Sequence, residues 1–170
     1  DKLFGLGYGM YAKIKGEIDR SRPRVDEREP WPELSAKQQQ EMDQAVGMLR
    51  EAADQGHMMA QVDCGEVYGF GDGVAKDDRL SFVYQEKAAK QGHTASQFNT
   101  GVNCRDGLGC EQSYERAAEW FEKASRKGDA DAMLNLGLLY RNGQGVPQDH
   151  NRTVQLFRQS AALGHPRAMS

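Results

Sequence analysis

The stretch Leu136–Asp149, LGLLYRNGQGVPQD, joins the end of one apolar helix to the start of a second helix through a loop with two closely spaced glycines. The same pattern stands 36 residues earlier at 100–113, TGVNCRDGLGCEQS, and again 36 residues before that at 64–77, CGEVYGFGDGVAKD. Three glycine columns run through the copies: Gly65, Gly101 and Gly137; Gly71, Gly107 and Gly143; Gly73, Gly109 and Gly145. Self-similarity at a fixed period of this length indicates stacked helical hairpins.

Further columns keep the same register along most of the chain. Turn glycines recur at Gly56, Gly92, Gly128 and Gly164, and pairs of small residues precede them at 52–53, 88–89, 124–125 and 160–161. The chain resembles the Sel-1-like repeat proteins, relatives of the tetratricopeptide repeats, whose unit reads roughly A-x-x-x-L-G-x-x-Y-x-x-G-x-G-V-x-x-D and closes on K-A-A-x-x-G. The matching residues of the third copy are Ala132, Leu136, Gly137, Tyr140, Gly143, Gly145, Val146 and Asp149. The resemblance covers about residues 38–170.

The period and the resemblance predict an all-α fold, an α/α superhelix (solenoid) of antiparallel helix hairpins stacked with a right-handed twist. We interpret 1–170 as a single solenoid fragment. Its expected parts are a degenerate first repeat at 1–57 with an inserted loop at 21–34, regular repeats at 58–93, 94–129 and 130–165, and the start of a truncated further repeat at 166–170. First helices are expected at 58–70, 94–106 and 130–142, and second helices near 77–91, 113–127 and 149–163. Ser35 is expected to cap the helix before them, with Gln38 as its capping-box partner.

Composition narrows the class of protein. Only 38% of the 170 residues are hydrophobic, and the mean hydropathy is -0.77, which suits a thin solenoid whose hairpins touch only their neighbours. The formal net charge is -3 with mixed signs and no basic block, so we expect no nucleic-acid partner. No apolar run reaches membrane-spanning length, so we expect no membrane insertion. No signal peptide is visible, so the sequence favours a soluble, intracellular protein but leaves the compartment open.

The segment 21–34 interrupts the repeat period. It carries Pro23, Pro30 and Pro32 together with a cluster of charges, which predicts a loop. Trp31, between two of these prolines, is its most suggestive residue. Two interpretations stay open: Trp31 contacts a partner, as loop residues often do, or it packs over the first hairpin.

The three cysteines, Cys64, Cys104 and Cys110, do not form an even disulfide framework. Cys104 stands in the tyrosine column and Cys110 in the valine column of the second copy. We expect both to act as small buried hydrophobic residues. A disulfide between them, or a metal site, is the alternative, although no zinc-like spacing supports a metal.

No catalytic motif stands out. His57, His93 and His165 share a column with Asp129, so we expect them to cap helices rather than to ligate a metal together. The resemblance implies a possible exception, since some bacterial members of the family have been described as hydrolases of penicillin-like substrates. The sequence contains no Ser-x-x-Lys, G-x-S-x-G, H-E-x-x-H or Walker motif. We expect no enzyme activity and no cofactor.

An arc on each first helix, between two apolar sides, is expected to line the inner, concave wall of the solenoid. The expected partner-binding residues are Asp63, Glu66, Phe70, Asn99, Val102, Asp106, Asn135, Leu138 and Asn142, together with Trp31. An asparagine amide can both donate to and accept from an extended peptide backbone, and tetratricopeptide proteins often use one so, which is what the resemblance adds. We therefore expect a non-catalytic scaffold or adaptor that binds a peptide or protein surface in this groove.

Two other functions stay open: a hydrolase of the kind described for some relatives, and a structural spacer or self-associating segment of a larger protein. The repeat restarts at 164–169, which we interpret as a fragment of a longer repeat protein. The face of the last helix, with Val154 and Phe157, is expected to be exposed or to contact another chain, and 166–170 to be mobile if it is not covered. Val62, Phe98 and Leu134 are expected to pack against the next first helix.

Overall fold

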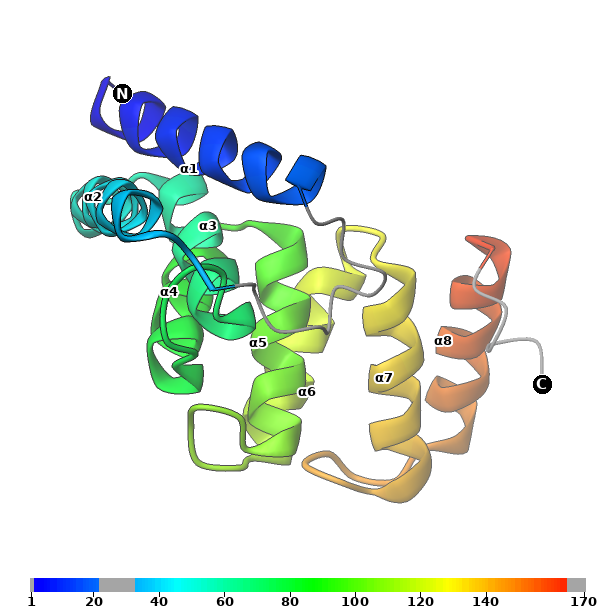
Figure 1. The fold of residues 1–170 in the computed structure, drawn as a ribbon. Coiled ribbons are helices and arrows are strands. Elements are labelled where there is room, and N and C mark those ends of the chain that lie inside the picture. Colours follow the sequence, from blue (N-terminus) through cyan, green and yellow to red (C-terminus); the bar gives the residue numbers. More distant parts are fainter. Residues whose placement is uncertain (1, 22–32, 165–170) are drawn as a thin grey trace. The chain divides into compact units, whose positions relative to one another are not determined.

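The structure is a computed structural model that describes residues 2–21 and 33–164, and it forms two compact units, Asp1–Lys87 and Ala88–Ser170 (Figure 1). The described residues form eight α-helices and no strand. The helices are α1 (Lys2–Ser21), α2 (Ala36–Asp54), α3 (Met58–Phe70), α4 (Asp78–Lys90), α5 (Thr94–Asp106), α6 (Tyr114–Ser125), α7 (Ala130–Asn142) and α8 (His150–Ala162). The first unit ends within α4, and the second contains α5 to α8. Trp31, His165 and 166–170 lie outside the described residues.

The helix bounds follow the sequence pattern closely. The three expected first helices coincide with α3, α5 and α7 at both ends. The expected second helices are confirmed as α4, α6 and α8, each slightly shorter than its predicted range. The glycine after each first helix explains the sharp C-terminal ends, because Gly71, Gly107 and Gly143 adopt a left-handed conformation with φ of 73°, 72° and 66°.

The N-terminal ends are fixed by side-chain caps. Ser35 and Gln38 form the predicted capping box at the start of α2. His57 Nδ1 accepts the backbone N–H of Ala60 at 3.2 Å. The equivalent cap in α7 is Asp129 Oδ1, which accepts the N–H of Ala132 at 2.7 Å. His93 Nδ1 accepts the backbone N–H of Ser96 at 3.2 Å in the same way, so the histidine column is confirmed as a set of helix caps at its described members.

The first unit packs α1, α2 and α3 around one core (Figure 1). Its buried residues are Tyr11, Ile14, Met42, Ala45, Val46, Leu49, Ala52, Ala53, Ala60, Cys64, Val67, Tyr68 and Tyr84. A polar contact fixes α1 to the loop after α3. The Tyr11 hydroxyl donates to buried Asp72 at 3.1 Å, and Lys15 Nζ lies 3.5 Å from the same carboxylate oxygen.

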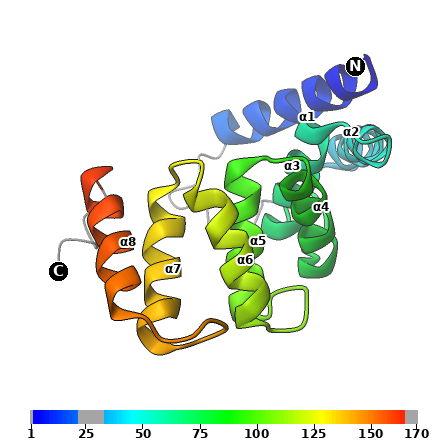
Figure 2. The same ribbon diagram turned by 180° about the vertical axis from the view of Figure 1, so that it is seen from behind.

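The second unit places α5, α6, α7 and α8 side by side, as Figures 1 and 2 both show. Within each hairpin the helices approach closely at one glycine. A Cβ atom on Gly101 of α5 would lie 2.7 Å from the Phe121 ring of α6. A Cβ atom on Gly137 of α7 would lie 2.6 Å from the Phe157 ring of α8. The absence of a side chain therefore lets an aromatic ring of the second helix lie directly on the backbone of the first.

Two aromatic side chains contact their own hairpin partners. The centroid of the Phe98 ring lies 5.9 Å from that of Phe121 in its own hairpin partner, and its expected packing against the next first helix stays a prediction. Phe157 was expected on the outer face of α8, but it is half-buried against Gly137. The Phe157 ring lies there because Gly137 has no side chain to occupy the space. Val154 does face outward, with 46% of its surface exposed.

The cysteines are free thiols. Cys104 is fully buried, as expected, and so is Cys64. Cys110 was also expected to be buried, but it is only half-buried. Burial raises the pKa of the Cys64 thiol to about 12. The Cys110 thiol donates to the Asn103 carbonyl at 3.6 Å, so the alternative of a disulfide with Cys104 is wrong. Among the described residues no group of three or more His, Cys, Asp or Glu side chains could hold a metal ion.

Candidate functional site

Six of the expected partner-binding residues lie on α5 and α7 of the second unit. On α5, Asn99 and Asp106 are exposed and Val102 is half-buried; on α7, Asn142 is exposed while Asn135 and Leu138 are half-buried. We call this set, with Arg105, the α5–α7 face. It combines accessible amide, carboxylate and apolar groups on two first helices of the same unit. None of these side chains is fully buried, so all can be reached from solvent.

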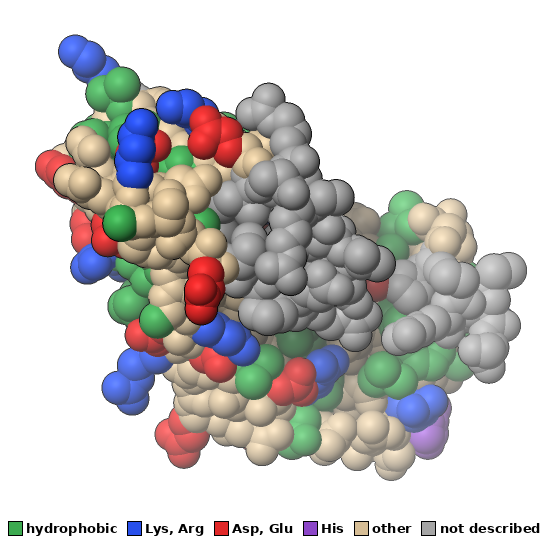
Figure 3. Space-filling view, viewed as in Figure 1, with side chains coloured by type: hydrophobic (Ala, Val, Ile, Leu, Met, Phe, Trp, Pro, Cys, Tyr) green, Lys and Arg blue, Asp and Glu red, His purple; other side chains and the backbone are tan. Residues whose placement is uncertain are grey.

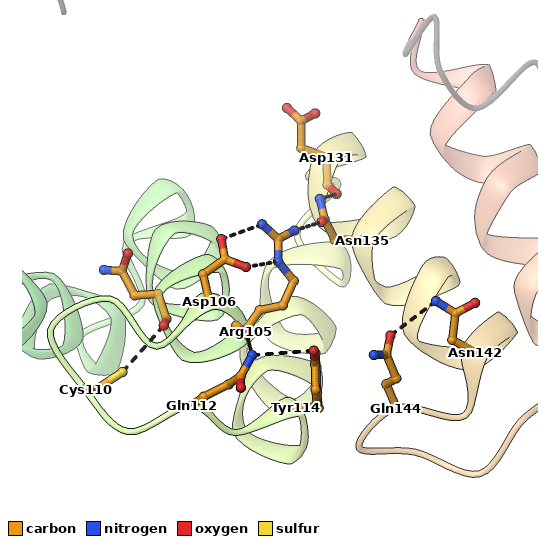
Figure 4. Close-up of polar contacts among 10 residues, drawn as sticks. Arg105, Asp106, Cys110, Gln112, Tyr114, Asp131, Asn135, Asn142 and Gln144 are labelled. Carbon is orange, nitrogen blue, oxygen red and sulfur yellow. Dashed lines mark hydrogen bonds and ion pairs between the residues drawn. The ribbon is translucent and has the colours of Figure 1, made fainter.

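Arg105 connects the two helices of this face, and the sequence analysis missed it. Its Nε and Nη2 donate to the two carboxylate oxygens of Asp106, each at 2.7 Å, and its Nη1 donates to Asn135 Oδ1 at 2.5 Å (Figure 4). The guanidinium thus lies between a side chain of α5 and a side chain of α7. Two parallel N–H···O bonds to one carboxylate form a geometrically specific pair. The recurrence of arginine 36 residues later, as Arg141, was the available sequence signal.

The pair also sets the charge state of the face. The hydrogen bond from Arg105, together with its positive charge, lowers the pKa of the Asp106 carboxyl. The same hydrogen bond to Asp106 raises the pKa of the Arg105 guanidinium. Both groups therefore stay ionised at neutral pH, and their charges balance each other.

Asn135 is held in one orientation. Its Oδ1 accepts from Arg105, and its Nδ2 donates to the Asp131 carbonyl at 2.8 Å (Figure 4). An amide side chain offers two acceptor lone pairs and two N–H groups, so one of each remains for another molecule. Asn99, at the same column of α5, makes no side-chain hydrogen bond within the described residues. Both asparagines thus keep donor and acceptor capacity, but only Asn135 is fixed in advance.

The last turns of α5 and α7 are built alike. Gln112 Nε2 donates to the Arg105 carbonyl at 2.7 Å, and Gln148 Nε2 donates to the Arg141 carbonyl at 2.8 Å. These bonds satisfy carbonyl groups that the helix end would leave without a partner. The two copies therefore present the same backbone at this place, and they differ in the side chains that they carry.

The remaining expected residues belong to the first unit or lie outside the described residues. On α3, Phe70 is 60% exposed, Glu66 is exposed and Asp63 is half-buried. Burial, followed by repulsion from Glu66, raises the pKa of Asp63 to about 6. One of its carboxylate oxygens is buried without a hydrogen-bond partner in the described part of the chain. Whether these residues continue the α5–α7 face stays a prediction, as does the role of Trp31.

One serine lies within reach of a base. Ser96 Oγ is 2.9 Å from His93 Nδ1, the distance expected of a nucleophile and its base. However, Ser96 is only 1% exposed, and the same Nδ1 accepts the backbone N–H of Ser96 at 3.2 Å. The contact is therefore the N-cap of α5, and a substrate has no access to the hydroxyl.

Charges of both signs are interspersed over the described part of the surface visible in Figure 3. No helix among the described residues combines the length and the apolar character needed to cross a bilayer.

These features define a helical-repeat protein whose hairpins present side chains from successive first helices on a common face. The chain belongs to the Sel1 repeat family: the Sel1 repeat model matches residues 37–57, 59–93, 94–129 and 130–165. No curated protein matches the chain. The predicted family and the all-α repeat fold with a period of about 36 residues are confirmed.

Solved structures agree with this assignment. A Sel1 repeat protein from Oxalobacter formigenes is 29% identical, with a TM-score of 0.68 over 95% of this chain and 60% of its own. A protective antigen present in uropathogenic Escherichia coli strains, which displays an SLR fold, is 30% identical, with a TM-score of 0.73 over 98% of this chain and 32% of its own. The chain thus spans less than two thirds of either protein. The Helicobacter pylori cysteine rich protein B shares the fold, with 20% identity and a TM-score of 0.58 over 77% of this chain and 94% of its own.

Sel1 repeat proteins are generally non-catalytic scaffolds for protein interaction. This general role of the family agrees with the predicted role of a protein-interaction scaffold.

Proposed function

We propose that this chain is a non-catalytic scaffold that binds an extended segment of a partner protein on the α5–α7 face. The observation that carries the proposal is the connection of α5 and α7 through Arg105, which holds Asn135 in one orientation beside accessible apolar and amide groups. A site that is ordered before binding loses less side-chain entropy when the partner docks.

The composition of the face favours a protein segment over other ligands. Val102 and Leu138 are half-buried and leave part of their apolar surface for contact. Asn99 and Asn135 offer both donors and acceptors, which is what a peptide backbone requires. The only described ion pair within the face is internally balanced, so it adds no strong field for a polyanion.

The proposal is tested with a random linear peptide library displayed on phage and selected on the intact chain. The selected peptides are then made as synthetic fluorescent probes, and their affinities are measured for the parent and for the double variant Asn99→Ala/Asn135→Ala. We expect the double variant to bind roughly thirtyfold more weakly, as the loss of two hydrogen bonds of about 1 kcal/mol each implies. Asn99→Ala is solvent-facing and should change the melting temperature little. Asn135→Ala also removes the hydrogen bonds to Arg105 and to the Asp131 carbonyl, so it should lower the melting temperature by a few degrees.

The matched control is Gln155→Ala/Gln159→Ala, which removes two exposed amide side chains from α8. This control variant should bind the probes as the parent does. Probes that bind the Asn99→Ala/Asn135→Ala variant with the parent's affinity would show that the face is not the site. If variants in 21–34 lose binding instead, the inserted loop is the site.

A further inference from the structure

We infer that Arg141 receives a carboxylate from an acidic side chain of the bound segment, in the way that Arg105 receives Asp106. This inference rests on the proposed function, because it names the chemistry of the partner at one place on the α5–α7 face. Arg141 lies at the edge of this face, because it directly precedes Asn142 in the last turn of α7.

The second repeat supplies the template. In the last turn of α5, the Arg105 guanidinium donates to both carboxylate oxygens of Asp106, through hydrogen bonds of 2.7 Å from Nε and Nη2 (Figure 4). The carboxylate comes from the following residue of the same helix. Hydrogen bonds between ionised groups are about twice as strong as those between neutral groups. An arginine in this column is thus well placed to hold a carboxylate in a fork.

The third repeat keeps the arginine and loses the carboxylate. Arg141 and Asn142 occupy the columns of Arg105 and Asp106. An amide replaces the acid, and its Oδ1 lies 3.5 Å from Arg141 Nε, a long contact to a neutral acceptor. Within the described residues Arg141 makes no ion pair. The first repeat has Gly69 and Phe70 at these columns, so it offers no guanidinium there.

The surroundings leave Arg141 available to a ligand. Arg141 and Asn142 are both exposed, whereas Arg105 is half-buried. The Nδ2 of Asn142 donates to Gln144 Oε1 at 3.2 Å, which turns the amide toward the loop after α7 (Figure 4). One turn earlier Leu138 offers half-buried apolar surface. A segment that places an apolar residue on Leu138 can therefore bring a nearby Asp or Glu to the Arg141 guanidinium, which has no ion-pair partner among the described residues.

The test uses the same phage-displayed random peptide library, now selected separately on four forms of the intact chain. These forms are the parent, Arg141→Gln, Asn142→Asp and Arg158→Gln. The substitution Asn142→Asp keeps the arginine and supplies the missing carboxylate from within, as in the second repeat. Arg158 is the matched control, an exposed arginine on α8 without an ion pair among the described residues. The readout is the frequency of Asp and Glu in the selected peptides relative to the starting library.

We expect acidic residues to be enriched on the parent and on Arg158→Gln, and not on Arg141→Gln or Asn142→Asp. A fluorescent peptide selected on the parent should bind about tenfold more weakly to both of the latter variants. If the peptides depend on Asn99 and Asn135 but show no acidic preference, or keep it on Arg141→Gln, the inference is wrong while the proposed function stands. If they do not depend on Asn99 and Asn135, the proposed function itself fails.

Discussion

Replacing Gly101 by alanine tests the packing on which the hairpin geometry depends. A Cβ atom at this position would lie 2.7 Å from two ring atoms of Phe121 and 3.2 Å from a third. Phe121 is 0% exposed, so its ring has little room to move. Overpacking of a well-packed core costs about 1–3 kcal/mol, while the better helix propensity of alanine returns about 1 kcal/mol. We therefore expect a net loss of up to about 2 kcal/mol in the free energy of unfolding.

The assay is thermal unfolding followed by circular dichroism at 222 nm. For a chain of this size, each kcal/mol shifts the melting temperature by about 2–4 °C, so the melting temperature of Gly101→Ala should fall by up to about 8 °C. Gly47, in α2, is the matched control, because a Cβ atom there would meet nothing within 4 Å. Gly47→Ala should be more stable by about 0.5–1 kcal/mol.

A double-mutant cycle identifies the contact responsible. Phe121→Leu removes ring atoms that the new Cβ would meet, so Gly101→Ala should cost less in the Phe121→Leu background than in the parent. A coupling of about 1 kcal/mol is expected for residues in direct contact. If Gly101→Ala is as stable as Gly47→Ala, or if the cycle shows no coupling, the close approach of α5 and α6 is not what requires glycine.

Two further predictions concern ionisable groups. The pKa of Asp63 is raised to about 6 from 3.8, mainly by burial and then by Glu66, so its charged form weakens the folded state above that pH. Asp63→Asn should therefore have a higher melting temperature than the parent at pH 7.5. The difference in melting temperature should shrink as the pH falls through 6 toward 4. A difference that does not change with pH would contradict the burial argument. A thiol reagent should label the native protein fastest at half-buried Cys110 and slowly at fully buried Cys64 and Cys104. Labelling is measured by mass spectrometry, and equal rates at all three cysteines would contradict the assigned burial.

The repeat period was sufficient to predict the helices and their ends. Because each end is determined by a local cap, such as Ser35 or a left-handed Gly71, sequence columns place it to within about two residues. Helix faces were predicted with less success. The place of the Phe157 ring depends on the space beside Gly137. Helical periodicity predicts the direction in which a side chain leaves the helix but not the final position of a long ring.

The sequence predicted only part of the candidate site. The columns identified Asn99, Asn135 and Asp106 as accessible polar positions, since they alternate with buried apolar ones. They did not identify Arg105, because the reach of its long side chain to Asn135 joins residues 30 apart in the chain on neighbouring helices. The sequence shows that the third repeat has Asn142 where the second repeat has Asp106. That this change leaves Arg141 without a carboxylate follows only from the paired hydrogen bonds of Arg105 to Asp106 in the structure.

Site-directed photo-crosslinking is the most direct measurement of the proposed binding surface. A benzophenone amino acid is placed in turn at Leu138 on the α5–α7 face and at Gln155 on α8, and each protein is irradiated with the same fluorescent peptide selected on the parent. The account predicts a covalent adduct at Leu138 that unlabelled peptide suppresses, and none above background at Gln155. Equal adducts at both positions, or an adduct at Gln155 alone, would contradict the assignment of binding to the α5–α7 face.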